Sequence, residues 1–303
     1  MMNRRQFQCA LAGLAGLGPL AACSTIKPST AMNAIDSHTH VFLRTLPMPD
    51  RRRAPSGYDA TPEQLLALFD ASAVTHGVIV QPSFLGTDNS YLLDVLGRHP
   101  QRLRGIAVVQ PGIADEQLDA LQQAGVAGIR LNQVGLAAPD FSDPAWRRLL
   151  PRLQQRGMQV EVHQLARELP PLLAPLLDAG VNVVVDHFGR PDPALGVDDP
   201  GYRYLLAQGA SRRLWVKLSG AYRNGAGGRG EAVARQALPL LRAHLGTDRL
   251  MWGSDWPHTL FETATSHARQ RALLNEWLPD DGERQRALWD TPAALFGFTP
   301  RRA

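Results

Sequence analysis

Short apolar runs alternate with longer amphipathic runs along most of this chain, and this alternation restricts its fold more than any other feature. The apolar runs have the length and β-branched content of strands, and they occupy residues 34–37, 77–81, 105–109, 127–132, 159–163, 182–187, 214–219 and 250–255. Runs with the spacing of amphipathic helices lie at residues 62–73, 91–99, 115–124, 144–156, 169–179, 202–208, 231–245, 267–277 and 283–295. Eight strands that alternate with helices in this way predict an α/β fold of the (β/α)8 type, the TIM barrel.

The apolar runs suit a parallel sheet whose outer face is covered by helices. Residues 183–185 are three consecutive valines, whereas a strand with one wet face alternates apolar and polar residues. Glycine stands just after a helical run and just before the next strand, as it does at helix C-termini. The glycines in this position are Gly125, Gly157, Gly180 and Gly246. Because 44% of the 303 residues are hydrophobic, the chain can fill one barrel, which we place at residues 33–300.

The first residues have the organisation of an export signal. Arg4 and Arg5 precede an apolar run at residues 10–22, which is shorter than the roughly 20 residues that a membrane-spanning helix needs. The Arg-Arg-Gln-Phe sequence resembles a twin-arginine signal, and Leu-Ala-Ala-Cys, which ends at Cys23, resembles a bacterial lipobox. We therefore expect residues 1–23 to direct export and Cys23 to become a lipid-modified N-terminus. The alternative is an ordinary secretory signal that is cleaved nearby.

A short tether is expected between this signal and the barrel. Residues 24–32 are rich in serine, threonine and proline, a composition that favours an unstructured linker. The protein is then expected to be periplasmic and held at the membrane only by its lipid. Cys9 would leave with the signal, so that Cys23 remains as the one cysteine and no disulfide is expected.

The charge of the chain gives no reason to expect a nucleic-acid partner. The net charge is only +4, and the densest basic run, at residues 51–53, predicts a solvated loop. A long irregular stretch surrounds this run at residues 42–60, and we expect it to form a loop over the barrel mouth. The sequence does not indicate an oligomeric state.

The predicted strands end in polar residues, and in barrels of this type the active site lies at the carboxyl ends of the strands. The polar residues at these ends are His38, His40, Arg130, Asn132, His163, Asp186, His187, Lys217, Ser219, Ser254 and Asp255. Each of them alone is explained by a structural role, such as a helix cap or a hydrogen-bonded core histidine. Four histidines and a carboxylate at one rim of one barrel together indicate an active site.

Three imidazoles and one carboxylate at this rim make a suitable shell for a divalent metal, in particular Zn²⁺, and leave a position for water. These candidate ligands are His38, His40, His163 and Asp255. A metal held there lowers the pKa of its water to about 7 and polarises a substrate carbonyl. His187 then stays free as an acid, a base or an oxyanion partner. Alternatively, Asp255 is itself the base and acts without a metal, while the histidines hydrogen-bond the carbonyl oxygen.

Three segments resemble the hallmark motifs of a known family. They read Ile-Asp-Ser-His-Thr-His at residues 35–40, Val-Asp-His-Phe-Gly-Arg-Pro at 185–191 and Trp-Gly-Ser-Asp-Trp-Pro-His at 252–258. In order and spacing they resemble the amidohydrolase-related superfamily, in the branch that contains pyrone-dicarboxylate and sugar lactonases. The resemblance extends from about residue 34 to 298 and implies a (β/α)8 hydrolase. The active-site residues that it implies are His38, His40, His187 and Asp255.

The resemblance to the pyrone-dicarboxylate lactonases also implies how the substrate is held. Arg130 and Arg223 stand where arginine binds substrate carboxylates in that pattern, and a guanidinium matches a carboxylate with two hydrogen bonds. The structural alternatives are an ion pair inside the barrel mouth for Arg130 and solvent exposure for Arg223. Tyr58 is a candidate counterpart of a substrate-binding tyrosine, and Ser83 is a candidate polar contact.

One departure from that pattern concerns the metal. Where the lactonase pattern has a tyrosine at the end of the fifth strand, this chain has His163. Metal-binding members of the superfamily use a histidine at this place. The difference therefore favours a retained metal.

These observations predict a hydrolase that opens a carboxylate-bearing lactone with water activated at Asp255, with or without a divalent metal. A second interpretation is a zinc-dependent decarboxylase of an aromatic or muconate-type acid, in which His187 handles protons. The zinc ligands in that interpretation are again His38, His40, His163 and Asp255. A third is a tethered binding lipoprotein that keeps the barrel without catalysis, although the intact set of strand-end residues argues against it.

Overall fold

The computed structural model describes residues 33–50, 53–55 and 57–299. The predicted export signal at residues 1–23, the lipid-modified Cys23 within it and the tether at residues 24–32 lie outside the described residues. No helix in the described part of the chain is long and apolar enough to cross a membrane.

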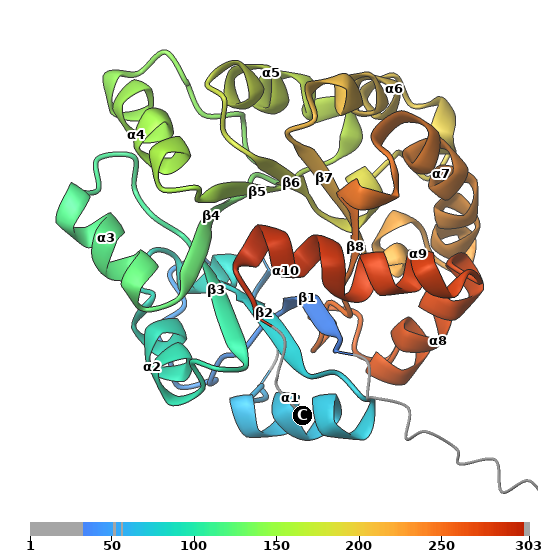
Figure 1. Cartoon of the computed structure of the whole chain (residues 1–303), viewed down its shortest axis with the longest axis horizontal. Coiled ribbons are helices and arrows are strands. Elements are labelled where there is room, and N and C mark those ends of the chain that lie inside the picture. Colours follow the sequence, from blue (N-terminus) through green and yellow to red (C-terminus); the bar gives the residue numbers. More distant parts are fainter. Residues whose placement is uncertain (1–32, 51–52, 56, 300–303) are drawn as a thin grey trace, which may run out of the picture. The chain divides into compact units, whose positions relative to one another are not determined.

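Eight parallel strands form one sheet in the order of the sequence, β1 to β8, and helices surround them (Figure 1). The strands are β1 Ile35–Thr39, β2 His76–Val80, β3 Leu103–Ala107, β4 Val126–Asn132, β5 Gln159–His163, β6 Val183–Val185, β7 Leu214–Leu218 and β8 Leu250–Trp252. Residues just after β8 close the barrel onto β1, because Asp255 N donates to His38 O at 2.8 Å and His40 N donates to Trp256 O at 2.8 Å. The predicted (β/α)8 fold is confirmed.

A helix follows each strand and packs on the outside of the barrel (Figure 1). These helices are α1 Pro62–Ala71, α2 Ser90–Arg98, α3 Asp115–Gln123, α4 Pro144–Gln155, α5 Pro170–Asp178, α6 Pro200–Ala207, α7 Arg229–Leu245 and α8 His267–Trp277. Four glycines adopt the positive φ that the helix C-terminus requires at these places, with values of 94° for Gly125, 66° for Gly157, 74° for Gly180 and 88° for Gly246.

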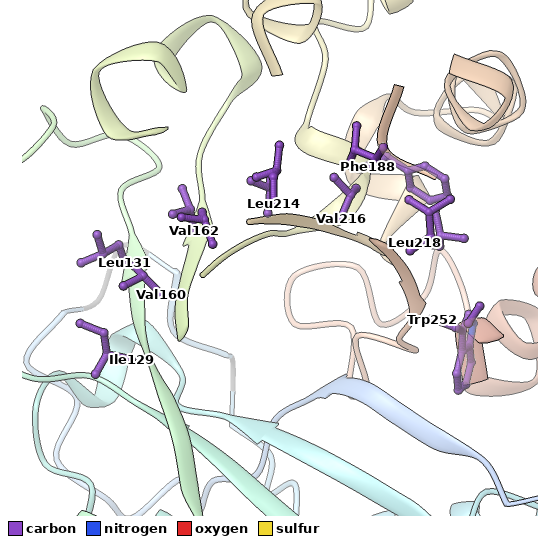
Figure 2. Close-up of a cluster of buried hydrophobic side chains, with 14 of the residues drawn as sticks. Ile129, Leu131, Val160, Val162, Phe188, Leu214, Val216, Leu218 and Trp252 are labelled. Atoms are coloured by element: carbon purple, nitrogen blue, oxygen red, sulfur yellow. The ribbon is translucent and has the colours of Figure 1, made fainter. Parts of the chain in front are cut away.

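Alternation along the strands separates the outer core from the barrel interior. Figure 2 shows buried apolar side chains of the outer layer, among them Ile129, Leu131, Val160, Val162, Leu214, Val216 and Leu218. Because successive strand residues point to opposite faces, the residues between them point into the barrel. Among those residues are Arg130, Glu161 and Lys217, and each of these three is buried. The period of two therefore places charged side chains beneath the site.

The last described helices close the barrel at the amino ends of the strands. The predicted helix at residues 283–295 is in fact three pieces: α9 Asp281–Gln285, a π-helical turn at Arg286–Asp290 and α10 Thr291–Phe296. Trp289, Ala293 and Phe296 pack in one cluster with residues of the barrel interior such as Val78 and Met251. In Figure 1, α10 lies across the barrel beside β1 and β8.

The stretch from Phe42 to Ala60 forms the expected long connection at the barrel mouth. Its two ends pair with each other, since Phe42 and Ala60 exchange two backbone hydrogen bonds of 2.9 Å. Phe42 also packs edge-on against Phe84, with 5.1 Å between the ring centres. This contact fixes the connection against the residues that follow β2.

Candidate active site

A pocket opens at the carboxyl ends of the strands, where the sequence predicts the site. It is lined by His40, Arg53, Pro82, Ser83, Phe84, Arg130, Asn132, His163, His187, Arg223, Asp255 and Thr259. Eight of the residues singled out from the sequence are in this lining: His40, Ser83, Arg130, Asn132, His163, His187, Arg223 and Asp255. His38 lies beneath it and is fully buried.

Asp255 lies at the centre of the polar contacts. Its Oδ1 is 3.5 Å from Nε2 of His40 and 3.8 Å from Nε2 of His38. Its Oδ2 accepts a hydrogen bond of 2.5 Å from Nε of Arg223 and one of 2.6 Å from the hydroxyl of Tyr222. One oxygen is therefore fixed by two donors, while Oδ1 has no hydrogen-bond partner among the described residues.

The Asp255 side chain is an ionised carboxylate despite its burial. Burial alone favours the protonated acid, but the positive charge of Arg223 is the main influence that outweighs it and holds the pKa of Asp255 well below its ordinary value. The pKa of the Tyr222 hydroxyl is raised well above its ordinary value, first by burial and then by the Asp255 charge. Tyr222 therefore remains a donor, and Asp255 remains able to accept a proton at Oδ1.

His38 and His40 reach Asp255 from β1 and its end, two residues apart. Nδ1 of His40 donates to the carbonyl oxygen of Val80 at 2.7 Å, so that Nε2 is the nitrogen turned towards the carboxylate. Nδ1 of His38 lies 3.0 Å from Nζ of Lys217. Burial, followed by the charge of Lys217, holds the pKa of His38 well below its ordinary value, so this ring is neutral at neutral pH.

His187 reaches the same carboxylate from the end of β6. Its Nε2 is 4.0 Å from Oδ2 of Asp255, and its Nδ1 is 2.9 Å from Oγ of Ser219. Burial is the main cause of a His187 pKa well below the ordinary value. Gly220 leaves room for this pair, because a Cβ there would lie 2.7 Å from Nδ1 of His187 and 3.0 Å from Oδ2 of Asp255. With its φ of 52°, this position requires glycine both for backbone conformation and for space.

The strands β6 and β8 are shorter than their apolar runs predict, and the site explains both differences. His187 and Asp255 have φ values of 53° and 61°, which a strand residue does not adopt. Each backbone turns sharply just after the buried strand, and the turn directs the side chain into the pocket. Such strained backbone is concentrated at functional sites.

The structure places His163 beside an arginine. Its Nε2 lies 3.0 Å from Nη1 of Arg190, and since a guanidinium only donates, this nitrogen is the acceptor. The ring also packs edge-on against His187, with 4.7 Å between centres. His163 therefore lies in the pocket but outside the group formed by His38, His40 and Asp255.

Arginines surround the pocket in greater number than the sequence suggests. Arg130 and Arg223, the two predicted contacts, are 5% and 8% exposed. Arg130 donates to Gln81 O at 3.1 Å, and Arg223 has an Nη1 without a hydrogen-bond partner among the described residues. Arg53, from the run expected on a solvated loop, also lines the pocket. Burial first, and then the charges of Arg223, Arg190 and Arg130, lower the pKa of Arg53 to about 9. Burial, followed by the charge of Arg223, lowers the pKa of Arg190 to about 10.

Buried arginines that lower one another's pKa mark the pocket as a site for an anion. Arg53, Arg190 and Tyr222 were not predicted from the sequence as site residues. Arg190 lies in the motif at residues 185–191, and Tyr222 directly precedes Arg223. These two positions in the sequence were the signals that could have identified Arg190 and Tyr222 as site residues.

Tyr58 and Ser83, the remaining two predicted contacts, differ in position. Ser83 begins the 3₁₀ turn Ser83–Leu85 and lines the pocket. The Tyr58 hydroxyl donates to Oε1 of Glu262 at 2.8 Å, and its ring packs against Phe42. Tyr58 is absent from the residues that line the pocket, and it links the long connection after β1 to the segment that follows β8.

A candidate metal-binding group is present. The potential ligand atoms of His38, His40 and Asp255 all lie within 4.8 Å of one another, and the three side chains are buried. Nε2 of His38 and Oδ1 of Asp255 have no hydrogen-bond partner in the described part of the chain. Two imidazoles and a carboxylate form a donor set that divalent transition metals accept. The residues present thus fit a metal by their chemistry and proximity.

Comparison with known proteins gives matches over almost the whole barrel. A family model described as amidohydrolase matches residues 35–298. The 4-sulfomuconolactone hydrolase of Rhizobium radiobacter is 30% identical over 289 residues, which cover 92% of this chain and 95% of that protein. The 2-pyrone-4,6-dicarboxylate hydrolase of Comamonas testosteroni is 31% identical over 278 residues, which cover 87% and 90%.

Solved structures give the same result. A Pseudomonas putida protein assigned as a 2-pyrone-4,6-dicarboxylic acid hydrolase has 42% identity and a TM-score of 0.84, with 89% of this chain and 99% of that chain covered. A 2,6-dihydroxybenzoate decarboxylase from Rhizobium matches with 14% identity and a TM-score of 0.61, over 88% and 98% of the two chains. That second likeness concerns the fold alone.

Proposed function

Because this chain belongs to the amidohydrolase family, and because its pocket sets an ionised carboxylate among arginines, we propose that it opens a lactone that bears acidic groups. The observation that carries the proposal is the state of Asp255. One of its oxygens is fixed by Arg223 and Tyr222, and the other has no partner among the described residues and faces the pocket histidines. This is the arrangement of a general base whose orientation is set in advance.

The reaction begins with a proton transfer to Asp255. Oδ1 takes a proton from a water molecule, whose oxygen attacks the lactone carbonyl and gives a tetrahedral oxyanion. Hydrogen-bond donors at the pocket floor stabilise that charge, which develops only as the reaction proceeds. The acyl C–O bond of the ring then breaks, and the proton held on Asp255 passes to the ring oxygen that leaves. The product is a hydroxy acid or its keto tautomer with one more carboxylate than the substrate.

The arginines hold the acidic groups of the substrate. Arg223 has its free Nη1 next to the base, and Arg130 lies on the other side of the pocket at the end of β4. Arg53 reaches the pocket from the long connection above. Guanidinium groups at three places suit a substrate with more than one acidic group, because each can donate N–H hydrogen bonds to a carboxylate or a sulfonate. The names of the two similar hydrolases describe substrates of this kind.

Zn²⁺ is the metal that we propose for the group formed by His38, His40 and Asp255, since imidazole and carboxylate are its usual ligands. A bound metal would polarise the lactone carbonyl and lower the pKa of a coordinated water. His163 was also a candidate ligand, but its Nε2 is bonded to Arg190. A metal is not required for the base, because Asp255 is kept ionised by Arg223 and Tyr222 and is able to act as a base by itself.

A panel of lactones tests the proposed function. The panel contains 2-pyrone-4,6-dicarboxylate, 4-sulfomuconolactone, a lactone with one carboxylate and an uncharged lactone of the same ring size. We expect ring opening of the charged lactones, and we expect kcat/KM to fall by about 10-fold or more for each acidic group removed. Release of carbon dioxide from the same panel would instead indicate the decarboxylase. No reaction with any lactone would contradict the proposal.

We also propose that the protein works in the periplasm as a lipoprotein, on the basis of residues 1–23. The support is the lipobox that ends at Cys23 and the paired arginines near the start. In a Gram-negative host, the wild-type protein is expected in the membrane fraction with an attached fatty acid, and the Cys23→Ser variant is expected without the lipid. Fractionation and labelling with a fatty-acid probe measure both. Wild-type protein that remains unlabelled in the cytosol would contradict this localisation.

A further inference from the structure

Fully buried charges lie in the barrel directly beneath the pocket. Nζ of Lys217, on β7, forms an ion pair with Oε2 of Glu161, on β5, and lies 3.8 Å from Oδ1 of Asp186. The three side chains are 0% exposed, and Phe296 closes the space on the other side, with its ring centre 6.0 Å from Nζ. Burying charges is costly even when they are paired. A charged group beneath a reactive site therefore calls for an explanation in the chemistry of that site.

Lys217 makes the hydrogen bond that sets the polarity of His38. Nζ lies 3.0 Å from Nδ1 of His38, in hydrogen-bonding geometry. Two carboxylate oxygens are also close to Nδ1 of His38: Oδ1 of Asp186 lies at 3.2 Å and Oε1 of Glu161 at 3.4 Å. Neither oxygen takes part in a hydrogen bond with any described residue. The ammonium group thus occupies the hydrogen-bonding direction of Nδ1, and the two carboxylates lie off it.

We infer that Lys217 is a positioning residue that keeps His38 in the tautomer with its proton on Nε2. An ammonium donates and cannot accept, so Nδ1 of His38 is the acceptor, and in the neutral ring the proton is then on Nε2. Nε2 is the atom that faces the pocket, 3.8 Å from Oδ1 of Asp255 and without a partner in the described part of the chain. His38 therefore directs an N–H donor at the reacting centre.

His40 has the opposite polarity. Its Nδ1 donates to Val80 O, because a carbonyl oxygen only accepts, so that Nε2 of the neutral ring carries a lone pair. The two histidines thus present one donor and one acceptor to the same carboxylate. In the lactone hydrolysis on which this inference rests, the His38 donor suits the carbonyl oxygen as it gains charge. The His40 lone pair suits the water that is deprotonated.

The same hydrogen bond works against a metal ion at His38. A ligating imidazole nitrogen needs its lone pair, which the tautomer with a proton on Nε2 does not offer. Without the ammonium, Asp186 and Glu161 are placed to accept a proton from Nδ1, and Nε2 becomes a ligand, as in carboxylate–histidine–metal sites. In the metal-free protein Lys217 therefore favours the donor over the ligand, and the Zn²⁺ site proposed above forms only when the proton leaves Nε2 of His38.

The tautomer can be measured without any substrate, by NMR of protein that contains ¹⁵N-labelled histidine. Signals of His38 are assigned by their absence from the His38→Gln variant. In the wild-type protein we expect the proton on Nε2. In the double variant Lys217→Met/Glu161→Met, which removes both members of the buried ion pair and so leaves neither unpaired, we expect it on Nδ1. Glu161→Gln keeps the ammonium and is the matched control, in which the proton is expected to stay on Nε2.

Two other measurements on the double variant follow from the change of tautomer. We expect kcat on an accepted lactone to fall about 100-fold with little change in KM, as when an oxyanion donor is lost. We also expect the affinity of the metal-free protein for Zn²⁺, measured by calorimetry, to rise by about 10-fold or more. A proton on Nδ1 of His38 in the wild-type protein, or on Nε2 in the folded double variant, would overturn the inference. If no lactone reacts, the proposed function fails, while the NMR result still decides the role of Lys217.

Discussion

The Asp255→Asn variant is expected to lose about 10³-fold or more in kcat, because an amide cannot accept the proton of the attacking water. The side chain is fully buried, and asparagine has nearly the same shape, so the pocket is expected to keep its form. Arg223 keeps an acceptor in the amide oxygen. Steady-state kinetics on a lactone that the wild-type enzyme opens measure the loss, and thermal unfolding checks that the variant is folded.

Asp248→Asn is the matched control for this variant. Asp248 accepts a hydrogen bond of 2.6 Å from Arg212 and lies just before β8, at the opposite end of the same strand. It therefore repeats the aspartate–arginine pair outside the site, and its loss is expected to leave kcat within about twofold of the wild-type value. A folded Asp255→Asn protein with a near-wild-type rate would rule out Asp255 as the base.

The second large effect is expected for Arg223→Met, which should lower kcat/KM by about 10³-fold through changes in both kcat and KM. Two physical causes combine in this arginine. Its Nε fixes Oδ2 of Asp255 and its charge is the main influence that keeps the carboxyl ionised, whereas its Nη1, which has no hydrogen-bond partner among the described residues, is available for the proposed substrate. A methionine of similar length removes the donor to the base and the contact to the acid together.

The separate measurement of kcat and KM distinguishes these two causes. Arg223→Lys keeps a charge without the two-pronged donor and is expected to recover only part of kcat. Arg212→Met removes an exposed arginine at the far end of the barrel and is expected to behave as the wild type. If Arg223→Met raises KM and leaves kcat unchanged, Arg223 binds substrate without assisting Asp255, and the proposed role in proton transfer is wrong.

The barrel could be predicted because eight apolar runs alternate with helical runs, and the core of its site because the polar ends of the strands meet at one rim of such a barrel. Within a strand, the period of two places His38 and His40 on one face, and it sets Glu161 and Lys217 between apolar neighbours in β5 and β7. That spacing fixes which side chains enter the barrel before any tertiary contact is known.

The other site residues could not be predicted, because their positions depend on turns. Arg190 has a φ of 50° and reaches back 27 residues to His163, which no local pattern indicates. Arg53 belongs to an irregular connection whose path is set by its ends, at Phe42 and Ala60. Sequence spacing likewise cannot give the donor that bonds Nδ1 of His38, since a tautomer depends on which neighbours the fold brings together.

The C-terminal cluster around Phe296 has a consequence for how molecules move through this protein. It fills the barrel at the amino ends of the strands. Within the described residues, the pocket is therefore open to solvent only at the carboxyl ends of the strands. Substrate must enter there, and product must leave there, past the same arginines. Because ring opening adds a carboxylate, we expect the arginines to bind the product more strongly than the substrate. We therefore expect accumulated product to inhibit competitively and product release to limit the rate of turnover.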